Sequence, residues 1–274
     1  MELYVTDLDG TLLNSECKIS DKSIKIINNL IKKGCNFTVA TARSLSSAKD
    51  ILEPLDLKMP VILNNGGFIY DLNKNENLVS NYIENEIAKE VISEVRNVNL
   101  NPFVHLETNN ENKLYYSGLF NYGEQFYYDL RMKAKDDRFE EVIEYDVKNK
   151  KVITIFLIGN EDELNNIYDV LKKKFPVLQY HLFLDVYSNY FWFEINNINA
   201  TKKNGIKFLK EYLNIENVSC FGDNLNDISM FEESDFSYAV ENAHLDLKKI
   251  ASEIIESNEN DGVAKYLERK CKYD

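Results

Sequence analysis

Residues 5–13 read VTDLDGTLL, an apolar start followed by two aspartates and a glycine. Its apolar start, together with the residues just before it, predicts a short buried strand over residues 3–6. Asp7 and Asp9 stand directly past that strand, and Gly10 lets the backbone turn sharply. In an open parallel sheet, ligands bind in the crevice beyond the carboxyl ends of the strands. We therefore expect the two carboxylates to belong to a functional site.

The spacing of the two aspartates bears on what that site binds. Asp7 and Asp9 are two positions apart, so in a tight loop both can converge on one small site. Two close carboxylates repel unless a cation lies between them or one is protonated, which suggests a hard divalent metal such as magnesium. A surface turn with Gly10 in the left-handed conformation is an equally good explanation of this stretch taken alone.

Short apolar runs and amphipathic segments alternate around this stretch. The expected strands are residues 3–6, 36–41, 60–63, 218–221 and 236–240, and the expected helices are residues 20–33, 44–53 and 203–213, with a short one near residue 228. Strands that alternate with helices imply a parallel sheet with right-handed crossovers. The sequence therefore predicts an α/β fold.

The pattern changes in the middle of the chain. The expected elements there are helices over residues 86–98 and 161–175 and from about residue 120, and strands over residues 103–107, 114–117, 152–158 and 177–184. This order is typical of an α+β unit. We predict that residues 82–185 form such a unit, inserted into a parallel-sheet domain made of residues 1–81 and 186–274.

Three further segments place polar side chains where a strand ends or a helix begins. In TVATAR at residues 38–43, Thr41 offers a hydroxyl and free backbone amides at the start of a helix, which suits a phosphate, although a plain helix cap also explains it. Lys202 opens another helix and can reach a phosphate oxygen or a nucleophile, whereas most such lysines project into water.

The third segment is GDNLND at residues 222–227. Asp223 and Asp227 add two carboxylates directly after a strand, with Asn226 between them as a neutral hydrogen-bonding group. A loop that caps the next helix is a fair explanation of each of these residues separately. Four such coincidences at four strand ends are hard to attribute to caps alone.

Composition limits the partners. A formal net charge of −13 argues against a long nucleic-acid footprint, but not against a phosphorylated substrate, because a metal ion and a lysine can reverse the field locally. The chain has no apolar run of about 18 residues, so we expect no membrane span and a cytoplasmic location. The scattered Cys17, Cys35, Cys220 and Cys271 predict free thiols. The oligomeric state is undetermined and compatible with a monomer.

The order DLDGT, TAR, lysine and GDxxND resembles the haloacid dehalogenase superfamily of phosphohydrolases, and specifically its Cof-type branch. Residues 63–71, the pair at 194–195 before the lysine, and segments 242–248 and 257–264 are also similar to that branch. The resemblance implies a Rossmann-like core over residues 1–81 and 186–274, with residues 82–185 as a C2B-type cap that sets substrate specificity. The chain departs from the pattern at Ala42, Lys203 and Asn197, where glycine, glycine and proline are usual.

The resemblance also implies roles for the acidic residues. Asp7 would be the nucleophile that forms an aspartyl-phosphate, with Mg²⁺ as cofactor. Asp9 would protonate the leaving oxygen and later activate water, while its backbone carbonyl faces the metal. Asp223 would complete the protein ligands of the metal, and Asp227 would support it.

Other residues would hold the phosphate. Thr41, Lys202 and Asn226 are the expected donors to its oxygens, with Ala42 and Asn65 in support. Ala42 would crowd the backbone amides near the phosphate. Arg43 is either a phosphate clamp or the partner of a nearby acid.

The expected function is hydrolysis of phosphate monoesters of small metabolites, such as sugar phosphates, nucleotides or cofactor phosphates. A phosphomutase that uses the same aspartyl-phosphate and a non-catalytic regulatory or binding protein are the alternatives. The middle unit carries aromatic residues that would either stack on a substrate ring or pack in a core: Tyr115, Tyr116, Tyr122, Phe126, Tyr127 and Tyr128. No residue selects one substrate.

Overall fold

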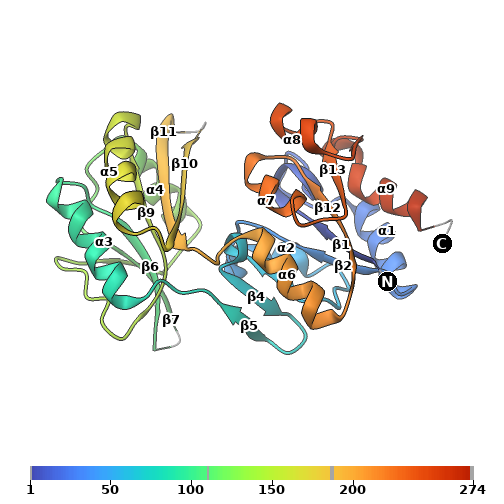
Figure 1. Cartoon of the computed structure of the whole chain (residues 1–274), viewed down its shortest axis with the longest axis horizontal. Helices are drawn as coiled ribbons and strands as arrows, with labels where there is room; N and C mark the ends of the chain where they lie inside the picture. The colour runs from blue at the N-terminus through green and yellow to red at the C-terminus, as the bar shows by residue number, and fades with distance from the viewer. Residues whose placement is uncertain (1, 110, 186–187, 272–274) are drawn as a thin grey trace. The chain divides into compact units, whose positions relative to one another are not determined.

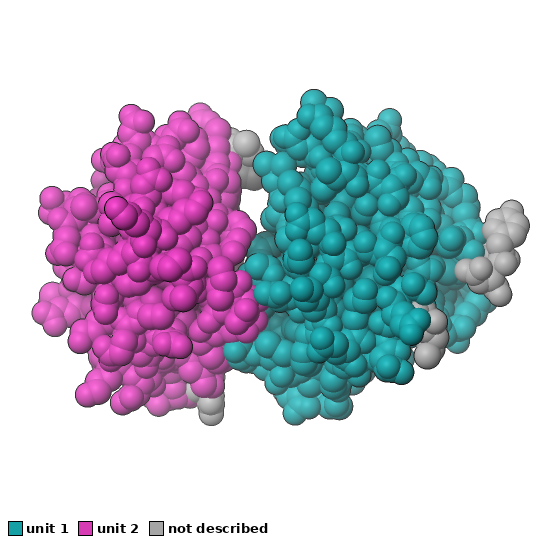
Figure 2. Space-filling view, in the orientation of Figure 1, with its two compact units in different colours: residues 1–80, 200–274 teal, residues 81–199 magenta. Residues whose placement is uncertain are grey.

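The computed structural model describes residues 2–109, 111–185 and 188–271. The chain forms two compact units, coloured teal and magenta in Figure 2. Unit 1 comprises Met1–Ser80 and Ala200–Asp274, and unit 2 comprises Asn81–Asn199. No helix in the described residues has both the length and the apolar character needed to span a membrane.

Unit 1 is built on a parallel sheet in the order β14-β13-β12-β1-β2 (Figure 1). Its strands are β1 (Glu2–Thr6), β2 (Asn36–Val39), β12 (Asn217–Gly222), β13 (Phe236–Val240) and β14 (Glu253–Ile255). Consecutive residues of β1 from Leu3 to Thr6 are all buried, as expected for a central parallel strand covered on both faces. Because β1 and β12 are neighbours, the loops that follow them leave the same edge of the sheet side by side.

Helices and short turns connect these strands or follow the last of them. They are η1 (Leu8–Leu12), α1 (Asp21–Lys32), α2 (Leu45–Leu52), α6 (Lys202–Leu213), η3 (Leu225–Asp227), α7 (Ile228–Phe231), α8 (Leu245–Ile250), η4 (Asn258–Asn260) and α9 (Gly262–Lys270). The α/β prediction is confirmed.

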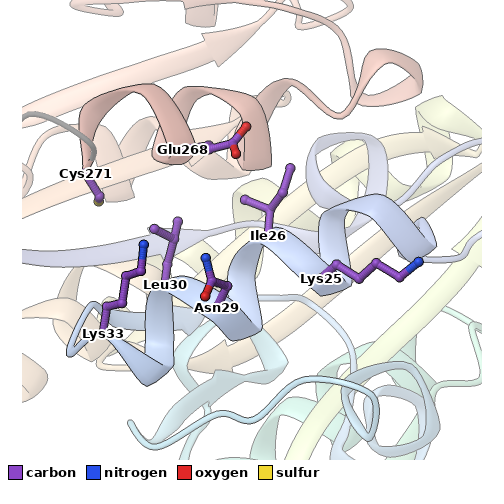
Figure 3. A pocket seen from close by; sticks show the side chains of 7 residues that line it. All are labelled: Lys25, Ile26, Asn29, Leu30, Lys33, Glu268 and Cys271. Carbon is purple, nitrogen blue, oxygen red and sulfur yellow. The ribbon is translucent and has the colours of Figure 1, made fainter.

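A hollow of about 270 Å³ lies between α1 and α9 (Figure 3). Its lining residues are Lys25, Ile26, Asn29, Leu30, Lys33, Glu268 and Cys271. Since α1 returns the chain from the carboxyl end of β1 to the amino end of β2, its last turns lie at the amino ends of the strands. This hollow is therefore at the opposite edge of the sheet from Asp7.

Residues 60–63 form a strand as predicted, and it lies between the parallel sheet and a second, antiparallel sheet. β3 (Val61–Leu63) forms an antiparallel ladder with β4 (Phe68–Asp71), which continues to β5 (Glu76–Ser80). On its other side β3 lies parallel to the segment after β2, through a bridge between Ile62 and Ala40 and a hydrogen bond from the Thr41 amide to the Ile62 carbonyl. The antiparallel neighbour is local in origin, because the turn η2 (Asn64–Gly66) reverses the chain directly after β3.

Unit 2 is a mixed sheet in the order β10-β11-β9-β6-β7-β8 with helices on it. The strands are β6 (Phe103–Thr108), β7 (Glu111–Tyr116), β8 (Phe139–Glu141), β9 (Lys151–Gly159), β10 (Leu178–Asp185) and β11 (Tyr190–Asn197). The helices are α3 (Asn85–Asn97), α4 (Tyr122–Lys133) and α5 (Glu161–Lys174). Residues of α3 and α5 share one apolar cluster with the sheet, and Tyr127 and Tyr128 of α4 join a second one.

The expected second boundary, between residues 185 and 186, differs from the boundary in the structure. β11 pairs along its length with β10 and also with β9, so its residues belong to unit 2, and unit 1 resumes at Ala200. Phe193 and Ile195 of β11 are fully buried in the core of unit 2. The aromatic run at residues 190–193 was the sequence signal for this strand.

Most of the tyrosines singled out in the middle of the chain pack inside unit 2. Tyr115 and Tyr116 are buried, and Tyr127 contacts Phe103, Phe156 and Trp192 with ring centroids 5.0–5.7 Å apart. Tyr122 is the exception among these, with 65% of its surface exposed. Core packing therefore explains the greater part of this aromatic content.

Alanine substitutions at two glycines, Gly66 and Gly34, would test how closely η2 packs against Thr201. Gly66 and Gly34 have nearly the same left-handed φ, +97° and +95°, but an added Cβ would overlap the Thr201 carbonyl at Gly66 and meet nothing within 4 Å at Gly34. We expect Gly34→Ala to lower the free energy of unfolding by about 1 kcal/mol, the backbone cost alone. Gly66→Ala should cost about 3 kcal/mol, because the start of α6 must also shift. Urea denaturation measures both, and equal costs would contradict the close packing.

Candidate active site

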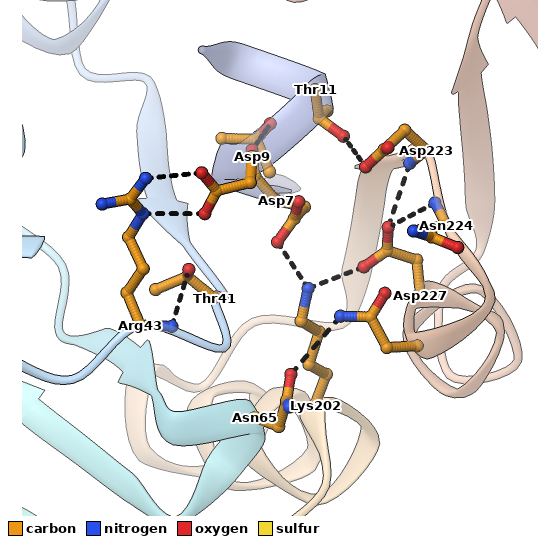
Figure 4. A network of polar contacts seen from close by, with 12 residues as sticks. Asp7, Asp9, Thr11, Thr41, Arg43, Asn65, Lys202, Asp223, Asn224 and Asp227 are labelled. Atoms are coloured by element: carbon orange, nitrogen blue, oxygen red, sulfur yellow. Dashed lines mark hydrogen bonds and ion pairs between the residues drawn. The ribbon is translucent and has the colours of Figure 1, made fainter. Parts of the chain in front are cut away.

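The site lies at the carboxyl ends of β1 and β12 (Figure 4). Thr6 pairs with Phe221 in the sheet, and the amide of Asp7 donates to the Phe221 carbonyl at 2.9 Å. The strand register therefore brings Asp7 beside Asp223, two residues past Phe221, although 216 positions separate them in the sequence. This proximity follows from the strand order.

Lys202 forms the centre of the site. Its Nζ lies 2.6 Å from Oδ1 of Asp7 and 2.6 Å from Oδ1 of Asp227. The lysine side chain is only 1% exposed and that of Asp227 is fully buried, so both charges are removed from water and depend on each other. Thr201 fixes the position of Lys202 by capping α6, since its Oγ1 accepts from the Asn204 amide at 3.1 Å.

The electrostatics of this group are those of an incompletely neutralised acidic cluster. Burial raises the pKa of Asp7 well above its ordinary value, and the charge of Asp227 raises it further, although Lys202 opposes both. Burial also raises the pKa of Asp223 to about 6, with Asp227 adding to the effect. For Lys202, burial lowers the pKa, but Asp227 and Asp7 outweigh it and the net pKa is raised. The lysine therefore stays charged, while a further cation would ease the ionisation of the carboxyl groups.

Oxygen atoms of Asp7, Asp223 and Asp227 lie within 4.8 Å of one another. Asp227 already uses both of its oxygens, because Oδ1 accepts from Lys202 and Oδ2 accepts from the amides of Asp223 at 2.9 Å and Asn224 at 3.1 Å. Asp7 and Asp223 each keep one carboxylate oxygen without a hydrogen bond from the described residues. The donor set therefore fits a hard divalent cation such as Mg²⁺ at Asp7 and Asp223, with Asp227 as the residue that orients them.

Two residues of the DLDGT stretch shape this acidic pair. Thr11 donates from Oγ1 to Oδ1 of Asp223 at 2.9 Å, a role that sequence analysis missed although the residue lies within the quoted motif. Gly10 has φ +75°, and a Cβ there would overlap the Asp223 carboxylate. A glycine is therefore required both by the backbone conformation and by the lack of space.

The side chain of Asp9 turns away from the three-carboxylate cluster. Arg43 donates two hydrogen bonds to the Asp9 carboxylate, from Nε to Oδ2 at 2.7 Å and from Nη2 to Oδ1 at 2.6 Å. Of the two expectations for Arg43, the structure shows the pairing with an acid. The two aspartates of the motif thus have different surroundings, with Asp7 buried beside Lys202 and Asp9 half-exposed beside Arg43.

The expectation of free backbone amides at the Thr41 turn is wrong for two of its residues. The amide of Thr41 donates to the Ile62 carbonyl at 2.9 Å, and the amide of Arg43 donates to Oγ1 of Thr41 at 3.1 Å. Pairing with β3 takes up the Thr41 amide, and the Thr41 side chain takes up the Arg43 amide. Thr41 is fully buried and Ala42 is exposed. Their phosphate-binding roles stay predictions.

Asn65 and Asn226 meet next to these groups. The Nδ2 of Asn226 lies 3.5 Å from Oδ1 of Asn65, the outer limit for a hydrogen bond. Asn65 has a left-handed φ of 52°, and its amide donates to the Thr41 carbonyl at 2.9 Å. The turns after β2, β3 and β12 are thereby joined. A weak contact of this kind leaves the Asn226 amide able to turn toward an oxygen of a ligand.

The chain is similar over nearly its whole length to a family of hydrolases and to individual phosphatases. A family model described as haloacid dehalogenase-like hydrolase matches residues 4–267. A putative phosphatase of Buchnera aphidicola subsp. Baizongia pistaciae is 30% identical over 273 residues, covering 97% of each chain. The 5-amino-6-(5-phospho-D-ribitylamino)uracil phosphatase YcsE of Bacillus subtilis is 29% identical over 276 residues, covering 97% of this chain and 94% of the relative.

Solved structures of other proteins superpose on nearly the whole of this chain. TM0651 from Thermotoga maritima superposes with a TM-score of 0.79 at 27% identity, covering 97% of this chain and 96% of that one. The subclass IIB sugar phosphatase BT4131 superposes with a TM-score of 0.75 at 20% identity, covering 99% of both chains. The second likeness shows the fold alone.

Replacing the buried lysine tests how far the site depends on it. Lys202→Met leaves Asp7 and Asp227 buried without their ammonium partner, so the free energy of unfolding at pH 7.5 should fall by about 4 kcal/mol. Lys203→Met is the matched control, because Lys203 pairs with Glu232 at the surface and should change stability by less than about 0.5 kcal/mol. Urea denaturation measures both, and similar small changes in the two variants would contradict the central role of Lys202.

The loss in Lys202→Met should depend on pH. Without the ammonium, the pKa of Asp7 rises beyond its already raised value, so the folded variant binds a proton more readily than the unfolded chain. Stability from such a group is present at low pH and is lost as pH rises through the folded-state pKa. The deficit relative to wild type should therefore shrink from pH 7.5 to pH 5, and a deficit that grows on acidification would contradict this account.

Proposed function

The chain belongs to the haloacid dehalogenase-like hydrolases and is a phosphatase of that family, and on this premise we propose that it hydrolyses phosphate monoesters of small metabolites with Asp7 as nucleophile. The observation that carries the proposal is the buried Asp7 held by Lys202 beside the partly unpaired Asp223. A carboxylate attacks phosphorus only where cations relieve its repulsion from the phosphate oxygens. One such cation, Lys202, is built into the chain.

The first step forms a bond from an Asp7 oxygen to phosphorus and breaks the bond from phosphorus to the leaving oxygen. Lys202 keeps the Asp7 side chain oriented by its 2.6 Å hydrogen bond, and Asp227 keeps Lys202 in place. Asp7 and Asp223 would hold a magnesium ion, and its charge would neutralise oxygens of the phosphate. Thr41 and Asn226 are the proposed additional donors to the phosphate.

Asp9 is the proposed acid and base. It gives a proton to the leaving oxygen in the first step and takes one from the water that hydrolyses the aspartyl-phosphate in the second. Arg43 occupies both oxygens of Asp9 in this structure, so Asp9 must leave at least one of these hydrogen bonds before it can transfer a proton to the substrate. Its half-exposed position allows that movement.

The proposed substrates are phosphorylated sugars or polyols. Two relatives from Bacillus subtilis, YcsE and YwtE, are named as phosphatases of 5-amino-6-(5-phospho-D-ribitylamino)uracil and are 29% and 27% identical to this chain. That compound carries its phosphate on a ribityl chain, so it heads the substrates to be tested, ahead of nucleotides and cofactor phosphates. We propose that unit 2 provides the selectivity among them.

Removal of the metal gives the next prediction. Phosphate release from a panel of sugar, polyol and nucleoside phosphates should stop after thorough chelation and return with magnesium. Calcium should not restore it, because its larger and looser coordination shell misplaces the nucleophile. Magnesium should also raise the melting temperature of the wild type, and less so that of Asp223→Asn. Undiminished phosphate release after chelation would refute the metal requirement.

The last prediction here separates the two aspartates. Asp7→Asn removes the nucleophile, so activity should fall by roughly 10⁴-fold or more and no phosphoenzyme should form. Asp9→Asn keeps the nucleophile but loses the acid and base, so the loss should be severe for an alkyl phosphate and milder in the first step for an aryl phosphate, which departs without protonation. Asp50→Asn, an exposed change on α2, is the control.

Rapid quench with labelled aryl phosphate provides the measurement. Label should accumulate on the Asp9→Asn protein, because no base activates water, and should be absent from the Asp7→Asn protein. Covalent label on Asp7→Asn would show that another residue is the nucleophile. Transfer of the label to a second hydroxyl of the substrate, in place of water, would instead indicate a phosphomutase.

A further inference from the structure

Two asparagines near the end of the chain hold the loop that follows the nucleophile. Asn242 donates from Nδ2 to the Gly10 carbonyl at 2.7 Å, and Asn258 donates from Nδ2 to the Leu13 carbonyl at 2.9 Å. The two residues are also joined to each other, because the backbone amide of Asn258 donates to Oδ1 of Asn242 at 3.0 Å. The Asn242 contact links residues 232 positions apart. Nothing in the proposed chemistry so far uses either side chain.

The segment that carries Asn242 also touches the second acidic loop. The amide of His244 donates to the backbone carbonyl of Asp223 at 2.7 Å. Ala243, which is buried and lies between Asn242 and His244 in the sequence, donates from its backbone amide to the Val240 carbonyl at 2.9 Å. This hydrogen bond fixes the turn after β13. Residues 242–244 therefore bridge the loop after Asp9 and the loop that carries Asp223.

The point of attachment is the peptide that joins Gly10 to Thr11. Asn242 binds the carbonyl of that peptide, and the next side chain, Thr11, binds the Asp223 carboxylate. Gly10 is in the left-handed region at φ +75°, where glycine is free to adopt other conformations. A rotation of this peptide would carry the Thr11 hydroxyl away from Asp223. An external hydrogen bond to the carbonyl selects the conformation that keeps the contact.

We propose that Asn242 and Asn258 are positioning residues of the phosphatase site. Asn242 holds the Gly10–Thr11 peptide, Asn258 holds Leu13 at the end of the same loop, and together they set the spacing of the Asp7 and Asp223 carboxylates. The inference rests on the proposed function, since that spacing matters only if the two carboxylates share a cation. A carboxamide is the group the arrangement needs, because Asn242 donates to one partner and accepts from another. An aspartate of the same shape would lack the donor.

The test compares Asn242→Asp and Asn242→Ala with Asn260→Asp. Asn260 is the matched control, because it is exposed in the same short turn as Asn258 and donates to Ser257. The assays are kcat and KM with p-nitrophenyl phosphate, magnesium binding by calorimetry, and urea denaturation. Loss of one positioning contact should lower kcat roughly tenfold and weaken magnesium binding about fivefold, with KM within about twofold of wild type. Asn260→Asp should match the wild type in all three.

The outcomes separate this inference from the proposed function. A wild type that releases no phosphate and binds no magnesium refutes the proposed function. A wild type that does both, with Asn242 variants that match Asn260→Asp in kcat and magnesium affinity, overturns the positioning role, even if the variants unfold more easily. Should the Asn242 variants fail to fold, Asn258→Ala removes the second carboxamide and is judged by the same three measurements.

Discussion

The rest of the site depends on the buried ammonium of Lys202. Its two 2.6 Å contacts join the end of β1 to the loop after β12, and its own backbone begins α6. Three carboxyl groups converge there, and without a cation among them their desolvation and mutual repulsion would oppose folding. The lysine makes it possible for Asp7 to be at once buried, oriented and adjacent to Asp223.

One ammonium against three carboxyl groups also leaves the cluster electrostatically incomplete. Asp227 is satisfied by the chain itself, through Lys202 and two backbone amides. Within the described residues, Asp223 accepts a side-chain hydrogen bond on one oxygen, from Thr11, and its pKa is raised to about 6. The unmet demand for positive charge falls at Asp7 and Asp223, which is the side where a metal and a phosphate are proposed to bind. The same excess of negative charge makes the fold depend on Lys202 and makes the site suitable for a cation.

Many features of the fold and of the site could be predicted from the sequence, because they are properties of short segments. The strand before Asp7, the glycine after Asp9 and the alternation of strands with helices are properties of short segments, and the α/β fold, the resemblance to haloacid dehalogenase-like hydrolases and the phosphatase assignment are confirmed. The predictions were incomplete or wrong where strand pairing decides the arrangement. Residues 60–63 were expected in a parallel sheet, and they also pair antiparallel with β4. Residues 190–197 belong to unit 2, because β11 lies between β9 and β10 and pairs with both.

The chemical groups at the strand ends can be read from the sequence, since a motif such as DLDGT combines an apolar strand, its carboxylates and the turn residue within a few positions. How those groups are paired depends on the tertiary structure. It paired Asp9 with Arg43, used the amides of Thr41 and Arg43 internally, and brought Asn242 to Gly10. The physical reason is that such contacts depend on strand order and register, which bring together residues tens to hundreds of positions apart and leave no periodic trace in the chain.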